Sequence, residues 1–183
     1  MGYAQTGDHE AALGFATKAL ALYESLDAET EVASLHNSLA MTYLEVGNLD
    51  RARHMATDAH HQAERLGDRR LLAHVLDTEA RIALASGKTD VALERATATL
   101  ALARELGHPH AEASALLTLA RAHRTGGNPA EAEAALSGAA SVLRREGPRS
   151  RLRDVLREWA DLLSSQDRHK EAVALLSEAI EGH

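Results

Sequence analysis

Three side chains between residues 54 and 61 have the types and the spacing of a metal site. His54, Asp58 and His61 fall at positions i, i+4 and i+7, so one face of a helix would present them together. Imidazole and carboxylate groups are ligands for divalent transition metals. A solvated helix face on which two histidines align has the same spacing. We expect this simpler arrangement, with no metal and no cofactor.

A second candidate for chemistry is the basic stretch RREGPRSRLRDVLRE, from Arg144 to Glu158, which holds six arginines. Nucleic acid binding would need a basic field, often with stacking aromatic side chains. Only Trp159 lies close by, and the whole chain of 183 residues has a formal charge of −7. Acidic residues are also interleaved at Glu146, Asp154 and Glu158. We therefore expect a salt-bridged loop and helix face, and no nucleic acid partner for this segment.

Motifs of the common enzyme classes are missing from the sequence. It has no glycine-rich phosphate loop, no G-x-S-x-G, no H-E-x-x-H and no cysteine. These absences favour a chain that is not an enzyme. No apolar run reaches the ~20 residues that cross a bilayer, and no signal-peptide pattern is present. We expect a cytoplasmic protein without a membrane partner.

The chain is organised by a repeat of 40 residues. The stretch GDHEAA at residues 7–12 recurs as GNLDRA, GKTDVA, GNPAEA and DRHKEA, each time 40 residues further on. Three columns of this repeat are alanine at nearly every position. They are Ala12, Ala52, Ala92, Ala132 and Ala172; Ala40, Ala80, Ala120 and Ala160; and Ala19, Ala59, Thr99, Ala139 and Ala179. A fixed period is typical of helical arrays in which each unit packs on its neighbours.

Each unit contains two amphipathic helical patterns. In the second unit, apolar residues with i, i+3 and i+4 spacing run through residues 32–43, and this pattern ends at Gly47. The second pattern ends at Gly67. Asn48 and Asn128 are expected to cap the helices that follow them. Because both connections are short, the two helices should pack antiparallel.

This pattern resembles the tetratricopeptide repeat (TPR) over essentially the whole chain. The residues that carry the resemblance in the second unit are Ala40, Tyr43, Gly47, Ala52 and Ala59. The period of 40 departs from the family's commonest period of about 34. The family's tryptophan is also missing, since its position holds His36, Leu76, Leu116 and Leu156.

The resemblance implies an all-α fold, a right-handed superhelical solenoid of antiparallel helix pairs with about four and a half repeats of 40 residues. We assign the whole chain to a single array. It comprises a partial repeat at 1–28 and repeats at 29–68, 69–108, 109–148 and 149–183.

In TPR arrays the first helix of each unit lines a concave groove, and the resemblance carries this groove over to the present chain. The predicted groove residues are Asn37, Met41, Asp77, Arg81, Leu117, Arg121, Arg124 and Arg157. Guanidinium groups suit bidentate binding of a carboxylate, and an asparagine amide can pair with a peptide backbone. One interpretation is a groove that binds a peptide or partner helix with an acidic or carboxylate anchor. In the other, Asp77, Asp154 and Asp161 pair with the arginines.

The sequence therefore favours a protein- or peptide-binding scaffold. The repeat resembles the TPR regions of bacterial transcriptional regulators, which implies a sensor or interaction region. The alternative is a self-assembly module that forms homodimers or stacked solenoids through uncapped ends. Apolar residues are expected to be exposed at both ends, at Leu13, Ala16 and Leu20 and at Val173, Leu176 and Ile180.

The repeat register also suggests how the chain begins. Tyr3 and Gly7 align with Tyr43 and Gly47, so residues 1–6 are expected to be the closing turns of a first helix. A turn at Gly7 and a cap at Asp8 would then start the next helix. On this interpretation the chain begins inside a repeat and is a fragment of a longer protein.

Overall fold

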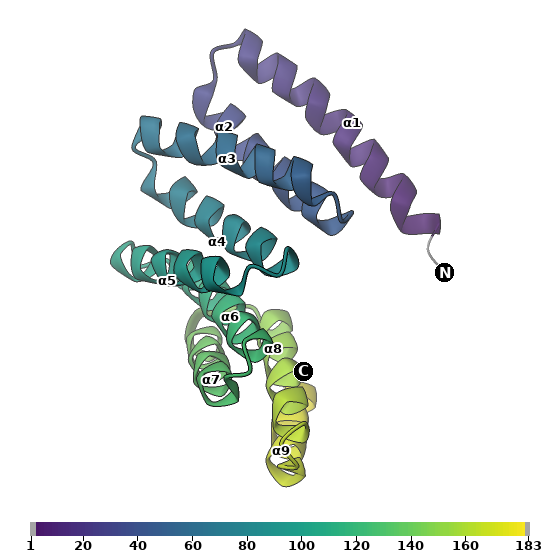
Figure 1. Ribbon diagram of the computed structural model, residues 1–183, viewed down its shortest axis with the longest axis vertical. Coiled ribbons are helices and arrows are strands. Elements are labelled where there is room, and N and C mark those ends of the chain that lie inside the picture. The colour runs from purple at the N-terminus through teal and green to yellow at the C-terminus, as the bar shows by residue number, and fades with distance from the viewer. Residues whose placement is uncertain (1–2, 182–183) are drawn as a thin grey trace. The chain divides into compact units, whose positions relative to one another are not determined.

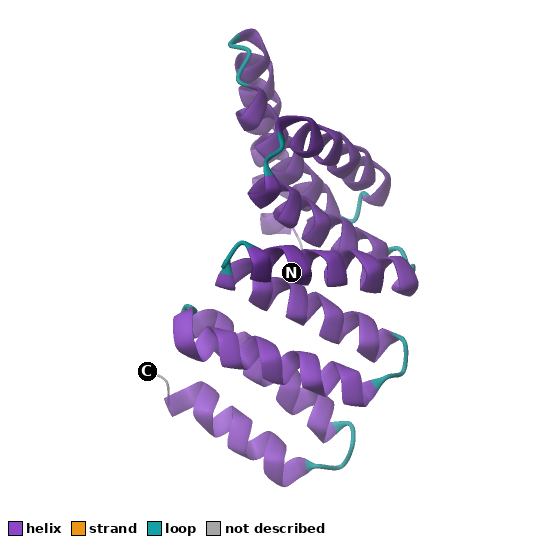
Figure 2. Ribbon diagram, turned by 90° about the vertical axis from the view of Figure 1, so that its left-hand side faces the viewer, coloured by secondary structure: helices purple, strands orange, loops and turns teal. Residues whose placement is uncertain are grey.

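The computed structural model describes the backbone of residues 3–181 and the side chains of residues 13–180. All regular structure in this range is helical, and the helices are joined by short loops (Figures 1 and 2). The all-α expectation is therefore confirmed. The helices in this part of the chain are α1 (Tyr3–Ser25), α2 (Glu29–Glu45), α3 (Leu49–Leu66), α4 (Arg69–Ala85), α5 (Thr89–Glu105), α6 (Pro109–Thr125), α7 (Pro129–Glu146), α8 (Arg149–Ser164) and α9 (His169–Glu181).

The helices fall into two compact units, which we call unit 1 (Met1–Gly87) and unit 2 (Lys88–His183). In unit 1, α1 packs on α2, α2 on α3 and α3 on α4, and α2 also contacts α4. In unit 2, each helix from α5 to α9 packs on the next helix along the chain. Packing of this kind is local, as in repeat arrays where each element contacts its sequence neighbours.

The alanine columns form the contacts between helices. Every member whose side chain is described is buried, apart from Ala19, which is half-buried. In unit 1, Ala40, Ala52 and Ala56 form one cluster with Ile82 of α4. Small side chains at these positions allow the helix axes to approach closely, and this close approach lets each helix pack on the next. Ala12 lies outside the described side chains.

Residues in the left-handed backbone conformation terminate the helices at regular intervals. Glycines occupy this conformation at residues 47, 67, 87, 107 and 127, where a side chain would be strained. Asp27 and Asp167 take the equivalent positions with φ of 51° and 61°. Aspartate tolerates this region better than most residues, so the turns are kept without glycine.

The connection from α7 to α8 is different. Gly147 is extended there, with φ −103° and ψ 162°, because the proline that follows disfavours helical conformations of the residue before it. A Cβ atom at this position would overlap the side chain of Leu143. Gly147 stands 80 residues after Gly67, at the equivalent position of the repeat, and its backbone conformation differs because of Pro148.

Two predictions about helix starts are wrong. α1 runs without interruption from Tyr3 to Ser25, so no turn at Gly7 and Asp8 separates residues 3–6 from the residues that follow. Helix-favouring residues on both sides allow the i to i−4 hydrogen bonds to continue, at a cost of about 1 kcal/mol for the glycine. Asn48 caps α3 by accepting a hydrogen bond from the Arg51 amide, but Asn128 forms no such bond at α7.

Candidate functional site

The predicted groove residues of unit 1 come from α2 and α4, which contact each other. The Arg81 guanidinium donates a hydrogen bond to the Met41 sulfur at 3.2 Å, so these two side chains meet as expected for neighbouring first helices. Asn37 is half-buried, and its Oδ1 atom has no hydrogen-bond partner among the described residues. A buried acceptor without a partner is a preferred place for a donor on a ligand. Asp77 is half-buried on α4.

The predicted groove residues of unit 2 come from α6 and α8. Arg121 of α6 is held by Glu158 of α8 in a bidentate pair, with nitrogen–oxygen distances of 3.0 and 3.1 Å. Asp77, Asp154 and Asp161 were the predicted internal partners of the arginines, and the partner of Arg121 is Glu158 instead. Leu117 is half-buried one turn before Arg121.

Arg124 and Arg157 differ from Arg121 in that both are exposed. Neither forms an ion pair or hydrogen bond within the part of the chain that the structure describes. Guanidinium groups carry five donors and stay charged at any physiological pH. The first helices of unit 2 therefore combine one neutralised arginine with two that are available to a partner.

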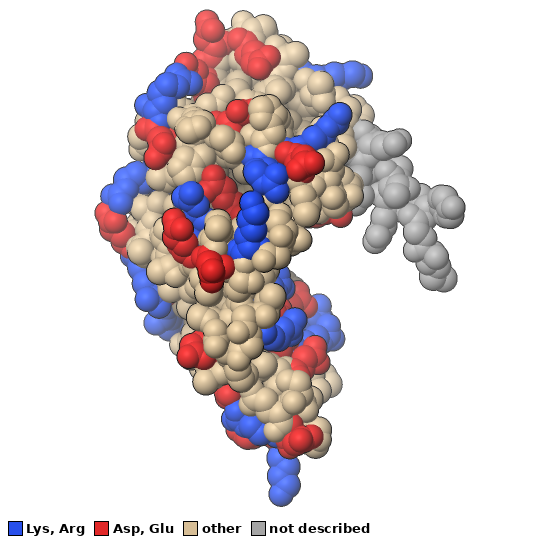
Figure 3. Space-filling view, viewed as in Figure 1, with Lys and Arg blue, Asp and Glu red and all other residues tan. Residues whose placement is uncertain are grey.

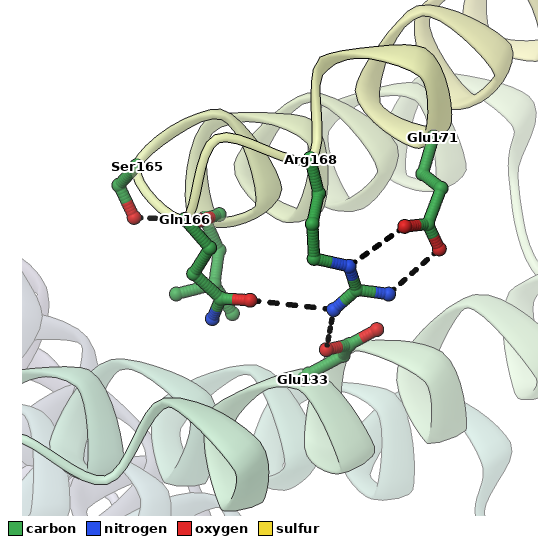
Figure 4. A network of polar contacts seen from close by, with 6 residues as sticks. Glu133, Ser165, Gln166, Arg168 and Glu171 are labelled. Carbon is green, nitrogen blue, oxygen red and sulfur yellow. Dashed lines mark hydrogen bonds and ion pairs between the residues drawn. The ribbon is translucent and has the colours of Figure 1, made fainter.

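The other charged clusters join helices to one another. Arg168, at the start of α9, pairs with Glu171 of its own helix at 2.7 Å and also with Glu133 of α7 (Figure 4). Hydrogen bonding to Arg168 lowers the pKa of Glu171. Arg168 thus ties the start of α9 to α7.

The basic stretch is also partly neutralised, and again by residues of other helices. Arg144 of α7 pairs with Glu178 of α9 at 2.7 and 2.8 Å. This hydrogen bonding lowers the pKa of Glu178 and raises the pKa of Arg144. On the face drawn in Figure 3, cationic and anionic side chains are interspersed.

His54 and His60 of α3 each lie beside a carboxylate. His54 Nε2 lies 3.6 Å from Asp58 Oδ2 on the exposed face of α3, and His60 contacts Glu79 of α4 at 2.9 Å. Among the residues that the structure describes, no three metal-binding side chains are grouped so as to hold an ion. No described helix is long and apolar enough to cross a lipid bilayer.

Comparisons with known proteins give matches of structure alone. No protein-family model matches the chain, and no curated protein matches its sequence. A Rap protein solved in complex with Competence and Sporulation Factor has a TM-score of 0.88 at 16% identity, over 97% of this chain and 50% of the Rap chain. A Podosopora anserina kinesin light chain protein with nearly identical TPR-like repeats has a TM-score of 0.70 at 19% identity, over 98% of this chain and 89% of that chain.

The chain has a TPR-like fold. A third TPR structure is a signal transduction ATPase (STAND) protein with a tetratricopeptide repeat sensor, from Pyrococcus horikoshii. Its TM-score is 0.74 at 19% identity, over 93% of this chain and 27% of the ATPase chain. The TPR-like chain therefore spans half of the Rap structure and about a quarter of the ATPase.

Proposed function

We propose that this TPR-like chain is a non-enzymatic scaffold whose first helices bind a protein or peptide with an acidic or carboxylate anchor. The observation that carries the proposal is the pair of exposed, unneutralised guanidinium groups of Arg124 and Arg157 in unit 2. Arg124 follows Arg121 by three residues on α6, and Arg157 directly precedes Glu158 on α8, so both lie near the ends of the Arg121–Glu158 ion pair in the sequence of these helices. A carboxylate that binds there would meet guanidinium donors that no described carboxylate occupies.

Unit 1 offers a complementary kind of contact. The half-buried side-chain amide of Asn37 is of a type that pairs with a peptide backbone, and Met41 provides an adaptable apolar surface one turn further along the helix. We propose that an extended segment of a partner uses these groups.

The relatives in fold support a regulatory context. The Rap structure contains a bound factor, and the STAND protein uses its repeats as a sensor. We propose by analogy that the TPR-like chain is the sensor or interaction region of a cytoplasmic transcriptional regulator. The full open reading frame tests this context, since a DNA-binding domain beside the array is expected.

Peptide selection tests the binding proposal. Random peptides displayed on phage are selected on the intact chain, and the affinity of enriched peptides is measured by calorimetry. We expect enriched peptides to carry acidic residues or a free carboxyl terminus. The double variant Arg124→Glu and Arg157→Glu should bind them at least about tenfold more weakly, because each reversal replaces attraction by repulsion.

The matched control is Arg145→Glu, which reverses the charge of an exposed arginine on α7, the second helix of its repeat. Its affinity should stay within about twofold of the wild type, since it lies outside the first helices. Equal binding of the enriched peptides by the double variant would rule out the assigned face.

A second candidate function is self-association through α9. Val173, Leu176 and Ile180 are 61%, 39% and 68% exposed and lie along one side of this helix. At the other end of the chain, the apolar residues named from the sequence are half-buried, while Phe15 and Leu22 are 72% and 58% exposed. Exposed apolar stripes of this kind often mark interfaces.

Light scattering over a concentration series tests self-association. We expect the mass-average molecular weight of the wild type to rise with concentration toward that of a dimer. The double variant Val173→Glu and Ile180→Glu should remain monomeric with an unchanged circular dichroism spectrum. A wild type that stays monomeric at every concentration would remove this candidate.

A further inference from the structure

Unit 2 contains a pocket of about 930 Å³ where the end of α7, the start of α8 and the end of α9 meet. Its volume lies within the range of about 300–1,000 Å³ that is usual for sites of small organic ligands. One part of the lining is apolar, with Leu143, Leu152 and Leu156, and another part is cationic, with Arg149 and Arg153. This mixture suits a ligand with an apolar body and an anionic group.

The origin of the pocket is local. Gly147 and Pro148 make an extended connection between α7 and α8 in place of a left-handed turn. In addition, Arg153 occupies a column that holds Ala33, Ala73 and Ala113 in the other first helices, where each alanine is at most 2% exposed. An arginine is too large for the space of a buried alanine, and Arg153 is half-buried at this position and lines the pocket.

The charge of Arg153 is the unusual part of the pocket. Its Nε atom is buried and has no hydrogen-bond partner among the described residues. A buried donor of a charged group that is left without a partner destabilises the folded state. Arg144 and Glu178 also line the pocket and neutralise each other, but the structure gives Arg153 no carboxylate within the described residues.

The start of α8 adds to the positive electrostatic potential in the pocket. Its N-cap residue Pro148 provides no side-chain capping bond, and its first turn contains no acidic residue. The positive end of the helix dipole therefore has no anion from its own sequence. Ser150 of this first turn and Ser177 of α9 also line the pocket and can supply hydroxyl donors.

We propose that this pocket binds a small amphipathic carboxylate, with its carboxylate on the Arg153 guanidinium and its apolar body against the leucine side chains. Arg153 as a whole is half-buried, and a carboxylate can pair in bidentate fashion with the two terminal nitrogens of its guanidinium group. Leu143, Leu152 and Leu156 shield the remainder of the ligand from water. The site is separate from the groove arginines and does not depend on the peptide-binding proposal.

Calorimetry with decanoate and decanol tests the proposal on the intact chain. Decanoate should bind with a dissociation constant on the order of 0.1 mM, as expected for a ligand of its size. Decanol, which has the same apolar body without the charge, should bind at least about tenfold more weakly.

Two variants test whether decanoate binding requires the positive charge of Arg153. Arg153→Met keeps an unbranched side chain and removes the cation, and it should weaken decanoate binding at least about tenfold. Arg153→Ala places the residue of the other first helices in this column, so it should fold and should also lose binding. The control Arg145→Met removes an exposed arginine near the end of α7 that does not line the pocket, and it should bind like the wild type.

Amide chemical shifts show where the ligand sits. Decanoate should shift the amide signals of Gly147, Ser150 and Ser177 in nitrogen-15-labelled protein. Shifts confined to the exposed apolar residues of α1 and α9 would overturn the proposal. So would undiminished decanoate affinity in both Arg153 variants, or no binding of decanoate at millimolar concentration.

Discussion

Three arginine–glutamate ion pairs in unit 2 join equivalent helices of neighbouring repeats. Their sequence separations are 37 for Arg121 and Glu158, 35 for Arg168 and Glu133, and 34 for Arg144 and Glu178. These separations are three to six residues shorter than the period of 40. By contrast, Arg81 and Met41 are separated by the full period. Long side chains thus bridge equivalent helices diagonally.

The ion pair between Arg144 and Glu178 should make the stability of unit 2 depend on pH. Hydrogen bonding to Arg144 lowers the pKa of Glu178 below its usual 4.5. The contribution of the pair is therefore complete above about pH 4.5 and is lost as the pH falls through the lowered pKa. Because both side chains are about 40% exposed, we expect the pair to contribute less than about 1 kcal/mol.

Urea unfolding between pH 7 and pH 3 measures this dependence. Glu178→Gln should lower the free energy of unfolding at pH 7 and should flatten its decline in acid. Glu146→Gln removes an equal charge from an exposed position and should keep the slope of the wild type. Identical slopes in the two variants would show that the ion pair does not contribute.

At the residue scale, the sequence did not predict which side chains pair. One interpretation gave Asp77, Asp154 and Asp161 as partners of the groove arginines, and the carboxylate that pairs with Arg121 is Glu158. Aspartate is one methylene shorter than glutamate, and the diagonal offset favours the longer side chain at Glu158. Arg153 left a visible signal, as the arginine in a column of alanines. That its Nε atom is buried without a partner among the described residues depends on three-dimensional packing, which the sequence repeat does not show.

At the scale of the helix, the alanine columns determine how closely the elements pack. Ala120 of α6 is 1% exposed, while Ala134 of α7 is exposed to solvent. Both residues lie in the interior of a helix, so the same substitution at the two positions changes helix propensity equally.

Ala120→Leu should lower the free energy of unfolding by about 1–3 kcal/mol, because the larger side chain overpacks the contact between helices. The control Ala134→Leu should change it by less than about 0.5 kcal/mol. Urea unfolding followed by circular dichroism gives both values. A mild effect at Ala120, comparable to that at Ala134, would mean that the column is not a close contact.

The sequence predicted helix ends correctly where the glycine itself determines the turn, and incorrectly where the residues beside the glycine determine it. Gly47 and Gly67 end their helices in the left-handed conformation that the sequence pattern indicates. Gly147 is extended because a proline follows it. Gly7 ends no helix, because α1 continues through it. Propensity alone does not decide whether a glycine inside a helix-favouring run will end that helix.

At the scale of the whole molecule, the stabilising interactions described above are contained within the units. The pair of His36 and Gln62 and the cluster around Ala40 belong to unit 1. The pairs of Arg121, Arg144 and Arg168 belong to unit 2, as does the cluster of Ala160, Leu163 and Ala172. In repeat arrays, stability is approximately a sum of such local terms, so a unit with its own core can fold alone.

The fragment of residues 88–183 should therefore fold without unit 1. We expect a helical circular dichroism spectrum and a cooperative urea transition, because the contacts from α5 to α9 and their ion pairs are all present in the fragment. Arg168→Ala, which removes the link from α9 to α7 and to Glu171, should shift this transition to lower urea concentration. Lys170→Ala, an exposed change in the same turn, should leave it in place. A fragment that melts without cooperativity would mean that unit 2 needs residues 1–87 for its own core.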